Sequence, residues 1–326
     1  MEITETSKYG CVSSLIKNGG KAWTSLRKTS TMATLTDFLS QTLHLSPLAT
    51  RIGLLCLTTQ LSLTILFNPK TKILPRGPWS DQPAFMAHQI VAFPWMIILA
   101  YYGWKEWEFD LISQYGTTTS PHDRLFGPSN PDDVPLAFGT GAILLWDIPS
   151  GLLAPSLRDP LMLAHHIGMF FVAALMGGMF SGGKMIGYYY VPFYFGVIET
   201  SSVFLSVVDQ FHPKRKSWHE WLNANKATSS VAKIANQLNE VCRILFALSF
   251  MLLRGIYFPF TSFAHAIPDI WKAYNDPPEG VPMWTCYFLC ISLFLFSCLQ
   301  SYWGLLVAKQ IKKALAGGGG DVKKKR

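Results

Sequence analysis

Two adjacent histidines, His165 and His166, lie within the apolar stretch DPLMLAHHIGMFFVAALMGGMF at residues 159–180. Ionisable side chains inside a membrane are costly unless they face a cavity or a partner. A neutral histidine that is oriented by a carboxylate acts as a general base or as a nucleophile. The doublet therefore predicts a polar site, and the rest of the chain must supply its partners.

Few other titratable groups lie well inside apolar stretches. At about 1.5 Å per helical residue, His88, Asp147, the doublet and Glu199 fall roughly 6–14 Å from one membrane face. Four helices would then converge on one polar layer, and Arg254 lies deeper, where it can act as a counter-ion. Simpler interpretations stay open. His88 can merely bond a neighbouring helix. Glu199 and Arg254 can form a structural ion pair, and Asp147 can cap a helix broken at Pro149.

These groups must be positioned by membrane-spanning helices. The 326-residue chain is 49% hydrophobic and 15% charged, whereas soluble domains carry about 25% charged residues. Seven stretches are long and apolar enough to cross roughly 30 Å of hydrocarbon: 49–67, 84–103, 136–155, 161–180, 186–208, 241–264 and 283–308. The predicted fold class is all-α, a polytopic membrane protein with about seven transmembrane helices. Prolines inside the spans predict kinked helices that can enclose a pocket.

The basic residues are distributed unevenly between the two membrane faces. The connectors after spans one, three and five, together with the C-terminal tail, hold 16 Lys and Arg residues, whereas the opposite connectors hold 4. Positive residues mark the cytosolic face. We therefore expect a cytosolic C-terminus and an N-terminus on the other side, against its own five basic residues. Because the net charge of +8 is split among loops without a DNA- or RNA-binding motif, nucleic acid is not an expected partner.

The cysteines and histidines do not form metal motifs. The six cysteines show neither an extracellular disulfide framework nor zinc spacing. Di-iron membrane oxygenases need several histidine boxes of the HxxHH kind, whereas the eight histidines here provide one bare doublet. No metal and no cofactor are therefore expected.

Six segments occur in a fixed order along the chain: HDRLFGPSN at 122–130, LAFGTGAILLWDIPS with Asp147, DPLMLAHHIG with the doublet, VIETSSVFLSVVDQF with Glu199, Ser201, Ser202 and Phe204, MLLRGIYFP with Arg254, and SYWGLLVAKQIKK. With His88 in the second span, they resemble the TLC domain that TRAM, Lag1 and CLN8 proteins share. The likeness is to the small TLC-domain-containing proteins of the TMEM56 type in particular. It covers about 83–315.

The resemblance implies six helices in a bundle or barrel around a lipid-accessible cavity, in the endoplasmic reticulum or a related membrane. It divides the chain into four parts: a mobile N-terminal tail (1–48), an extra transmembrane helix with its connector (49–82), the TLC domain (83–315) and a basic cytosolic tail (316–326). The N-terminal tail includes a short amphipathic stretch at 32–45. Lys323 and Lys324 resemble a dilysine signal for retrieval to the endoplasmic reticulum, and a basic tail on an anionic leaflet explains them equally well.

Ceramide synthases of this superfamily use the histidine pair in catalysis with acyl-CoA as the donor. By that resemblance the candidate catalytic residues are His165, His166, Asp147 and Glu199. The candidate lipid-cavity residues are His88, Ser201, Ser202, Phe204 and Arg254. The synthase signature continues with a His-Asp pair, a further Asp and Glu-x-Ala-Lys, whereas YYYVPFYFGVIETSSVFLS here keeps only the glutamate. This departure weakens ceramide synthesis as the activity.

Three functions are consistent with these residues. The leading hypothesis is a protein that binds or handles membrane lipid and contributes to lipid homeostasis. The first alternative is a ceramide-synthase-like lipid acyltransferase, with acyl-CoA as its second partner. The second alternative is a trafficking or translocation accessory of the endoplasmic reticulum, which the basic KKKR terminus and the TRAM and CLN8 likeness favour.

Overall fold

The computed structural model describes residues 31–107, 120–127, 130, 132–212, 214–225 and 230–317. All regular elements in these ranges are helical, and they contain no strand. Six helical segments of the described chain are long and apolar enough to cross a membrane: Pro47–Phe67, Pro83–Glu106, Val134–Leu153, Tyr188–Phe211, Ser230–Ala273 and Met283–Ala316. The all-α, multi-pass architecture expected from the sequence is confirmed.

The remaining predicted span, 161–180, is shorter than expected. Helix α8 covers Pro160–Met176, only 17 residues, and the side chain of Asp159 caps it by accepting two backbone hydrogen bonds from its first turn. The glycine-rich segment after Met176 is a turn, in which three glycines have positive φ. The chain therefore turns back four residues before the predicted end of the span, and a seventh crossing is not confirmed.

Prolines shape the spans Val134–Leu153 and Ser230–Ala273. The third span contains α6 (Val134–Ala137), the π-helix η2 (Phe138–Asp147) and α7 (Ile148–Leu153). The span Ser230–Ala273 contains α12 (Ser230–Ser249), the π-helix η6 (Phe250–Tyr257), α13 (Phe258–Thr261), the π-helix η7 (Ser262–Ala266) and α14 (Ile267–Ala273). Each π-helix ends two residues before a proline, at Pro149, Pro259 and Pro268. Proline lacks an N–H and clashes with the carbonyl one turn earlier, so a wider turn accommodates it. Asp147 and Arg254 lie in two of these π-helices, a setting frequent at functional sites.

A glycine divides the span Tyr188–Phe211. Its pieces are η3 (Tyr188–Tyr190), α9 (Val191–Phe195), η4 (Val197–Glu199), α10 (Thr200–Val208) and η5 (Asp209–Phe211). Gly196 separates α9 from η4 and lies against Gly103 of α4 (Pro83–Glu106), where a Cβ on Gly103 would stand 2.4 Å from the carbonyl carbon of Gly196. Only glycine permits backbones to approach so closely. The contact brings Glu199 and the start of α10 close to α4.

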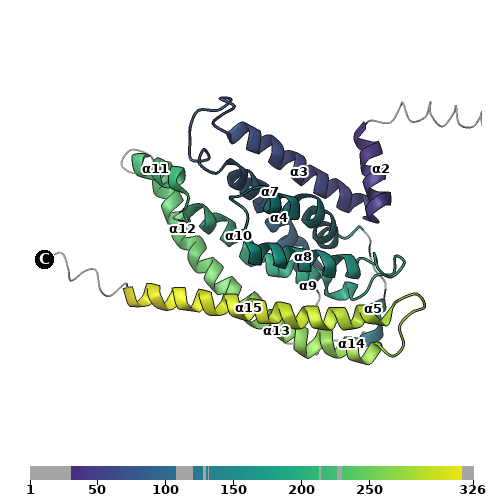
Figure 1. The fold of residues 1–326 in the computed structure, drawn as a ribbon. Coiled ribbons are helices and arrows are strands. Elements are labelled where there is room, and N and C mark those ends of the chain that lie inside the picture. The colour runs from purple at the N-terminus through teal and green to yellow at the C-terminus, as the bar shows by residue number, and fades with distance from the viewer. Residues whose placement is uncertain are drawn as a thin grey trace, which may run out of the picture.

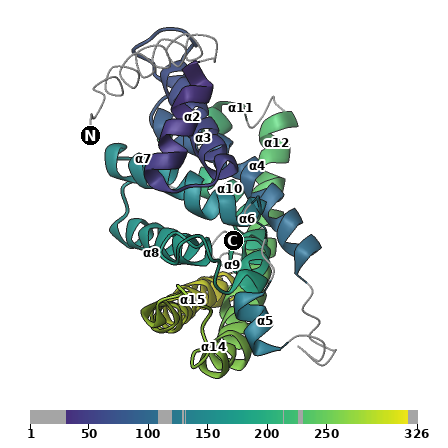
Figure 2. The same ribbon diagram turned by 90° about the vertical axis from the view of Figure 1, so that its right-hand side faces the viewer.

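The helices form an elongated bundle with two distinct ends. Figure 1 shows α3 (Pro47–Phe67) along one side and α15 (Met283–Gly317) along the other, with α4, α8 and α9 between them. Figure 2 looks along the bundle and places α8 on one flank and α12 on the opposite flank. The connector 68–82, the helix α11 (Lys216–Asn225) and the C-terminal turns of α15 lie at one end, which we call the basic end. The opposite end, with α5 (Pro121–Phe126) and α14, is the far end.

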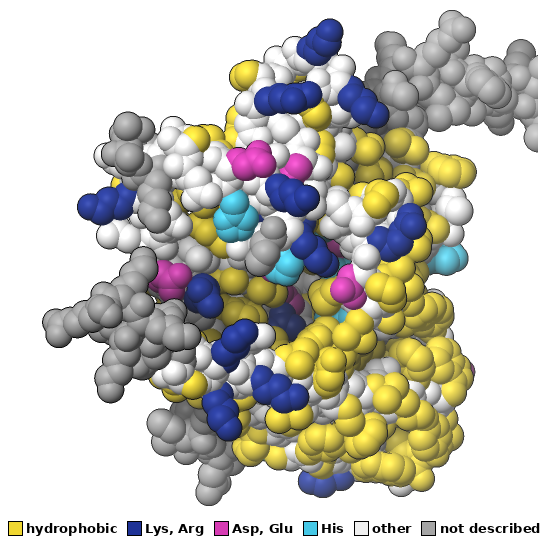
Figure 3. All heavy atoms as spheres, turned by 60° about the vertical axis from the view of Figure 1, so that its left-hand side comes forward, with side chains coloured by type: hydrophobic (Ala, Val, Ile, Leu, Met, Phe, Trp, Pro, Cys, Tyr) yellow, Lys and Arg dark blue, Asp and Glu magenta, His cyan; other side chains and the backbone are white. Residues whose placement is uncertain are grey.

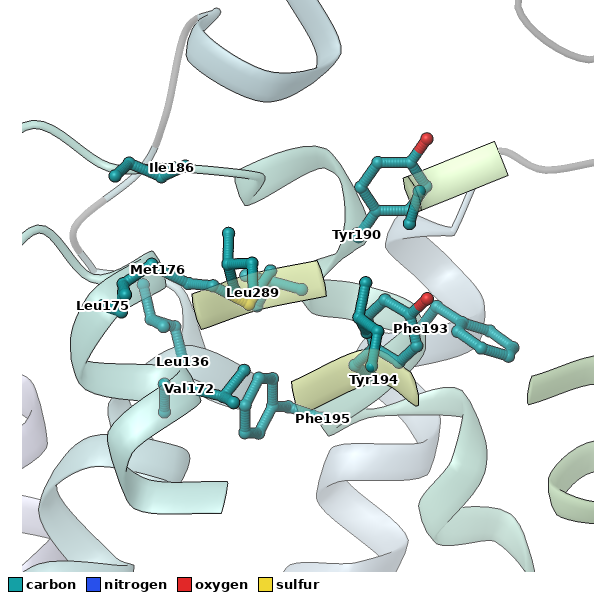
Figure 4. Close-up of a cluster of buried hydrophobic side chains, with 14 of the residues drawn as sticks. Leu136, Val172, Leu175, Met176, Ile186, Tyr190, Phe193, Tyr194, Phe195 and Leu289 are labelled. Carbon is teal, nitrogen blue, oxygen red and sulfur yellow. The ribbon is translucent and has the colours of Figure 1, made fainter. Parts of the chain in front are cut away.

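Two clusters of buried apolar side chains hold these helices together. One joins α3, α4 and η2 through residues such as Ala49, Leu99 and Trp146. The larger cluster joins α8, α9, α14 and α15. Figure 4 shows part of it, with α8 and α9 side chains facing each other and Leu289 of α15 between them. Burial of such side chains away from the membrane fixes the relative positions of helices that carry the polar groups.

A buried ion pair ties the far end together. Arg124 of α5 donates from Nε and Nη2 to the two carboxylate oxygens of Asp269 on α14, both at 2.6 Å. The hydroxyl of Tyr190 also donates to Asp269. Removing one partner of a buried pair would leave an uncompensated charge. These contacts therefore fasten α5, η3 and α14 to one another.

The short helix α2 (Thr31–Leu43) precedes the first span. It coincides with the amphipathic stretch expected at 32–45, since it buries Thr36 and exposes Leu35 and Phe38. Residues 1–30 of the predicted N-terminal tail and the residues Lys323 and Lys324 lie outside the described residues.

Candidate functional site

A cavity of about 400 Å³ lies between the helices. Apolar side chains from five of the six spans and from α8 form most of its wall, and α3 contributes none. Its polar lining is contributed by His88, Gln89, Asp147, His165, His166, Glu199, Ser201, Ser202, Ser206, Asp209 and Arg254. The structure thus brings together all the predicted site residues except Phe204, which lies on α10, partly buried and outside the cavity lining.

Asp147 is the centre of the polar cluster. Its Oδ1 lies 3.0 Å from Nε2 of His88 and its Oδ2 lies 2.7 Å from Nδ1 of His166. Three helical segments, α4, η2 and α8, therefore meet through one carboxylate. Asp147 makes no side-chain cap bond to the helix that follows it, so the interpretation as a helix cap does not describe its contacts. The side chains of Asp147 and His166 are 15% and 26% exposed, which leaves the cluster open to the cavity.

His165 points to a different environment from its neighbour. Its ring packs edge-on against Phe296 and Trp303 of α15, with centroid distances of 5.5 and 5.2 Å. Its Nδ1 is buried and has no hydrogen-bond partner among the described residues. The two histidines therefore have different contacts. His166 bonds Asp147, and His165 packs α8 against α15 at the cavity.

Arg254 forms a second polar group in the cavity lining. It donates to Oε1 of Glu199 at 3.1 Å and to the hydroxyls of Ser201 and Ser202 at 2.9 and 3.0 Å. It also donates to the carbonyl of Ile198. The ion pair between Glu199 and Arg254 that the sequence left open is present. It fixes η4 and the start of α10 against η6 while both charged side chains face the cavity.

Sequence reasoning missed the support behind His88. The His88 ring stacks on Trp146, with centroids 4.8 Å apart and planes 20° from parallel. The indole N–H of Trp146 donates to the side-chain oxygen of Gln60 on α3. A lone glutamine inside the first span was the available signal, because a buried amide needs a partner. Through these contacts α3, which contributes no residue to the cavity lining, supports the position of His88.

The surface around the cavity is charged at the basic end. Figure 3 shows Lys, Arg and His side chains, with a few carboxylates, around a hollow with hydrophobic walls, next to a broad hydrophobic surface. Exposed cations of this end include Lys70, Lys72, Arg76, Lys214, Lys216, Lys309, Lys312 and Lys313. A continuous hydrophobic surface suits contact with acyl chains, and the cations suit the anionic headgroup layer.

The cluster can accept, donate and hold protons. A histidine that donates from Nδ1 to a carboxylate keeps the lone pair on Nε2. His166 with Asp147 therefore has the arrangement of an oriented base or nucleophile, and it can equally bond a hydroxyl or amide of a bound lipid. In the part of the chain that is described, no group of three or more His, Cys, Asp or Glu side chains is arranged to hold a metal ion.

Comparison with known proteins gives one match. A family model described as the TLC domain matches residues 55–309. The matched region begins within α3, ends within α15 and contains the whole cavity lining. No curated protein and no solved structure matches the chain.

Proposed function

This chain belongs to the TLC domain family, and from that premise we propose that it binds membrane lipid in its cavity and contributes to lipid homeostasis. It is a multi-pass membrane protein. We propose the endoplasmic reticulum as its location, on the likeness to TLC proteins and on the dilysine-like residues Lys323 and Lys324. We also propose a cytosolic C-terminus, because the basic connectors and the C-terminal tail share one face.

One observation carries the proposal. A cavity of about 400 Å³ combines mostly apolar walls with two polar groups, the cluster of Asp147 with His88 and His166, and the pair of Arg254 with Glu199. Cavities of roughly 300–1,000 Å³ with few convergent polar groups are typical ligand sites. An amphiphile fits this division, since its chain packs on the apolar wall and its polar part meets the cluster.

A cavity-blocking variant tests lipid binding. Ser206 lines the cavity and its hydroxyl donates to the carbonyl four residues earlier. Ser249 makes the same local bond outside the cavity lining. We expect Ser206→Phe to reduce co-purified lipid severalfold by mass spectrometry, and Ser249→Phe to leave it unchanged. Equal lipid content in both folded variants would count against the proposal.

The geometry of His166 favours lipid acyl transfer as a second candidate. With Nδ1 on Asp147, Nε2 of His166 can take the proton of an attacking lipid hydroxyl or amine. The oxygen or nitrogen of the lipid then bonds to the acyl carbon of acyl-CoA, and the thioester bond breaks. The proton passes from His166 to the departing thiolate. Acyl-CoA turnover that falls in His166→Ala but not in His122→Ala, an exchange of an exposed side chain of α5 outside the cavity lining, supports the mechanism. Turnover that His166→Ala leaves intact removes it.

The accessory role in trafficking or translocation depends on the terminal KKKR sequence, which lies outside the described residues. Deletion of that sequence tests it, because unaltered cargo export would argue against this role.

A further inference from the structure

We propose that Arg215, at the basic end of the cavity, binds the phosphate of an anionic phospholipid whose acyl chains enter the cavity. The inference rests on the proposed lipid binding and adds the headgroup class that the site selects.

Arg215 is held in place by the first turn of α4. Its guanidinium carbon lies 3.2 Å from the ring centroid of Phe85. Its Nη1 donates to the side-chain oxygen of Gln82, and the amide of Gln82 donates to the carbonyl of Lys214 at 3.3 Å. An arginine stacked on an aromatic ring loses little further freedom when it binds an anion. These contacts therefore preorganise the guanidinium.

The positive charge of Arg215 lacks a close counter-ion. Among the described residues no carboxylate lies within 4.0 Å of it, since Asp81 and Asp209 interact with it from farther away. Its Nε is buried and has no hydrogen-bond partner in the described part of the chain. Burial lowers the pKa of Arg215, and the more distant carboxylates of Asp209 and Asp81 oppose this shift. Guanidinium groups bind phosphate oxygens through paired N–H donors, and Nη2 of Arg215, which donates to no described residue, is available to such an anion beside Nη1.

The location of Arg215 matches the cavity. Phe85 lies one helical turn before His88 and Gln89, which line the wall, so the separation along α4 is about 5 Å. Asp209 also lines the cavity and interacts electrostatically with both Arg215 and His88. A phosphate on Arg215 therefore leaves the attached acyl chains at the cavity opening. Neighbouring cations, the exposed Lys214 and Lys216, reinforce the attraction.

Competition between two short-chain lipids tests this site. Delipidated full-length protein in neutral detergent is mixed with equimolar dioctanoyl phosphatidic acid and dioctanoyl phosphatidylcholine, and native mass spectrometry measures the bound ratio. We expect about a tenfold preference for the anionic lipid, as one charge-assisted contact gives. Arg215→Gln should abolish the preference while phosphatidylcholine still binds. Arg158→Gln, an exposed arginine outside the cavity lining, should retain it.

Further arms distinguish the sources of phosphate and the failure modes. Inorganic phosphate or coenzyme A that displaces phosphatidic acid at equal concentration would assign a soluble ligand and overturn the proposal, as would an unchanged ratio in Arg215→Gln. If that variant does not fold, Phe85→Leu removes the ring on which the guanidinium stacks and should lower the preference, and an unchanged ratio in this variant would overturn the proposal instead. Binding of neither lipid to the wild type would refute the proposed function itself, whereas equal binding of both would refute only the headgroup site.

Discussion

A single carboxylate, Asp147, organises the polar residues of the cavity. It joins His88 and His166, which come from helices far apart in the sequence. Hydrogen bonds to a charged acceptor contribute about 1.5–3 kcal/mol each, more than a neutral amide can recover. The charge is therefore the property to test.

We expect Asp147→Asn to lower the free energy of unfolding by about 1–3 kcal/mol. Asparagine keeps the shape but cannot serve both histidines as a charged acceptor. Thermal unfolding in detergent measures the loss, and Asp132→Asn, an exposed position, provides the control. A variant as stable as the wild type would show that the histidines do not depend on this charge.

Asp133 gives a pH dependence near neutrality. It is 2% exposed and caps α6 by accepting the N–H of Leu136 at 2.7 Å. Burial, with a further contribution from the Glu106 carboxyl, raises the pKa of Asp133 to about 7, against about 3.9 in an unfolded chain. Between these values the folded state holds a proton that the unfolded state has lost. Stability should therefore fall as the pH rises through this window and level off above about pH 7.

The change is about 1.4 kcal/mol per pH unit in principle, so we expect a loss of about 1–3 kcal/mol between pH 5 and pH 7.5. Asp133→Asn keeps an N-cap residue without a titrating proton, and it should remove this slope. Melting temperatures across the pH range measure it, with Asp132→Asn as the neighbouring control. The idea fails if the slope persists in Asp133→Asn.

At the scale of elements, the contact of α4 with the span Tyr188–Phe211 depends on two glycines, Gly103 and Gly196. A Cβ on Gly103 would lie 2.3 Å from the amide nitrogen of Val197. Gly103→Ala should therefore push the helices apart and destabilise the protein by about 1–3 kcal/mol. It should also reduce co-purified lipid, because η4 carries Glu199 at the cavity. Thermal unfolding and lipid mass spectrometry measure both effects.

Gly304 of α15 provides the matched control. A Cβ there would meet only the sulfur of Met251, at 3.9 Å. Gly304→Ala should stabilise the helix by about 0.4–1 kcal/mol through the unfolded chain. If Gly103→Ala proved equally harmless, close packing at this crossing would not limit stability.

The sequence predicts elements better than partners. Helical rise alone placed His88, Asp147 and Glu199 in one layer, and the cavity contains all three, because depth depends only on where each helix begins. The link from Gln60 to Trp146 was not predictable, since it joins helices whose rotation is fixed by tertiary packing. The π-helices were also not predicted from the sequence. Hydrophobic patterns do not distinguish them from α-helices, and only their following prolines mark them. The glycine turn was expected, yet its start at Gly177 shortened α8.

At the scale of the molecule, the two ends differ in construction. The far end is tied by Arg124, Asp269 and Tyr190 with their charges buried, whereas the basic end carries exposed cations beside the cavity. If the basic end lies in the headgroup layer of the bilayer, the headgroup of a bound lipid contacts the cations there. The packed helices of the far end offer no such contact. This asymmetry predicts one orientation of the cavity relative to the membrane, with the basic end in the headgroup layer.

We expect α8 to cross the bilayer despite its 17 residues, because that length lies at the lower limit for a span.

Cysteine labelling tests this expectation. In a background in which the six native cysteines are replaced, Arg158→Cys and Lys184→Cys introduce exposed thiols at the two ends of α8. Lys313→Cys marks the basic end of α15. A membrane-impermeant maleimide added after selective permeabilisation of the plasma membrane should label positions 158 and 313. Position 184 should react only after full solubilisation. Labelling of 158 and 184 from the same side would show that α8 lies on the membrane and that the remaining six spans alone set the topology.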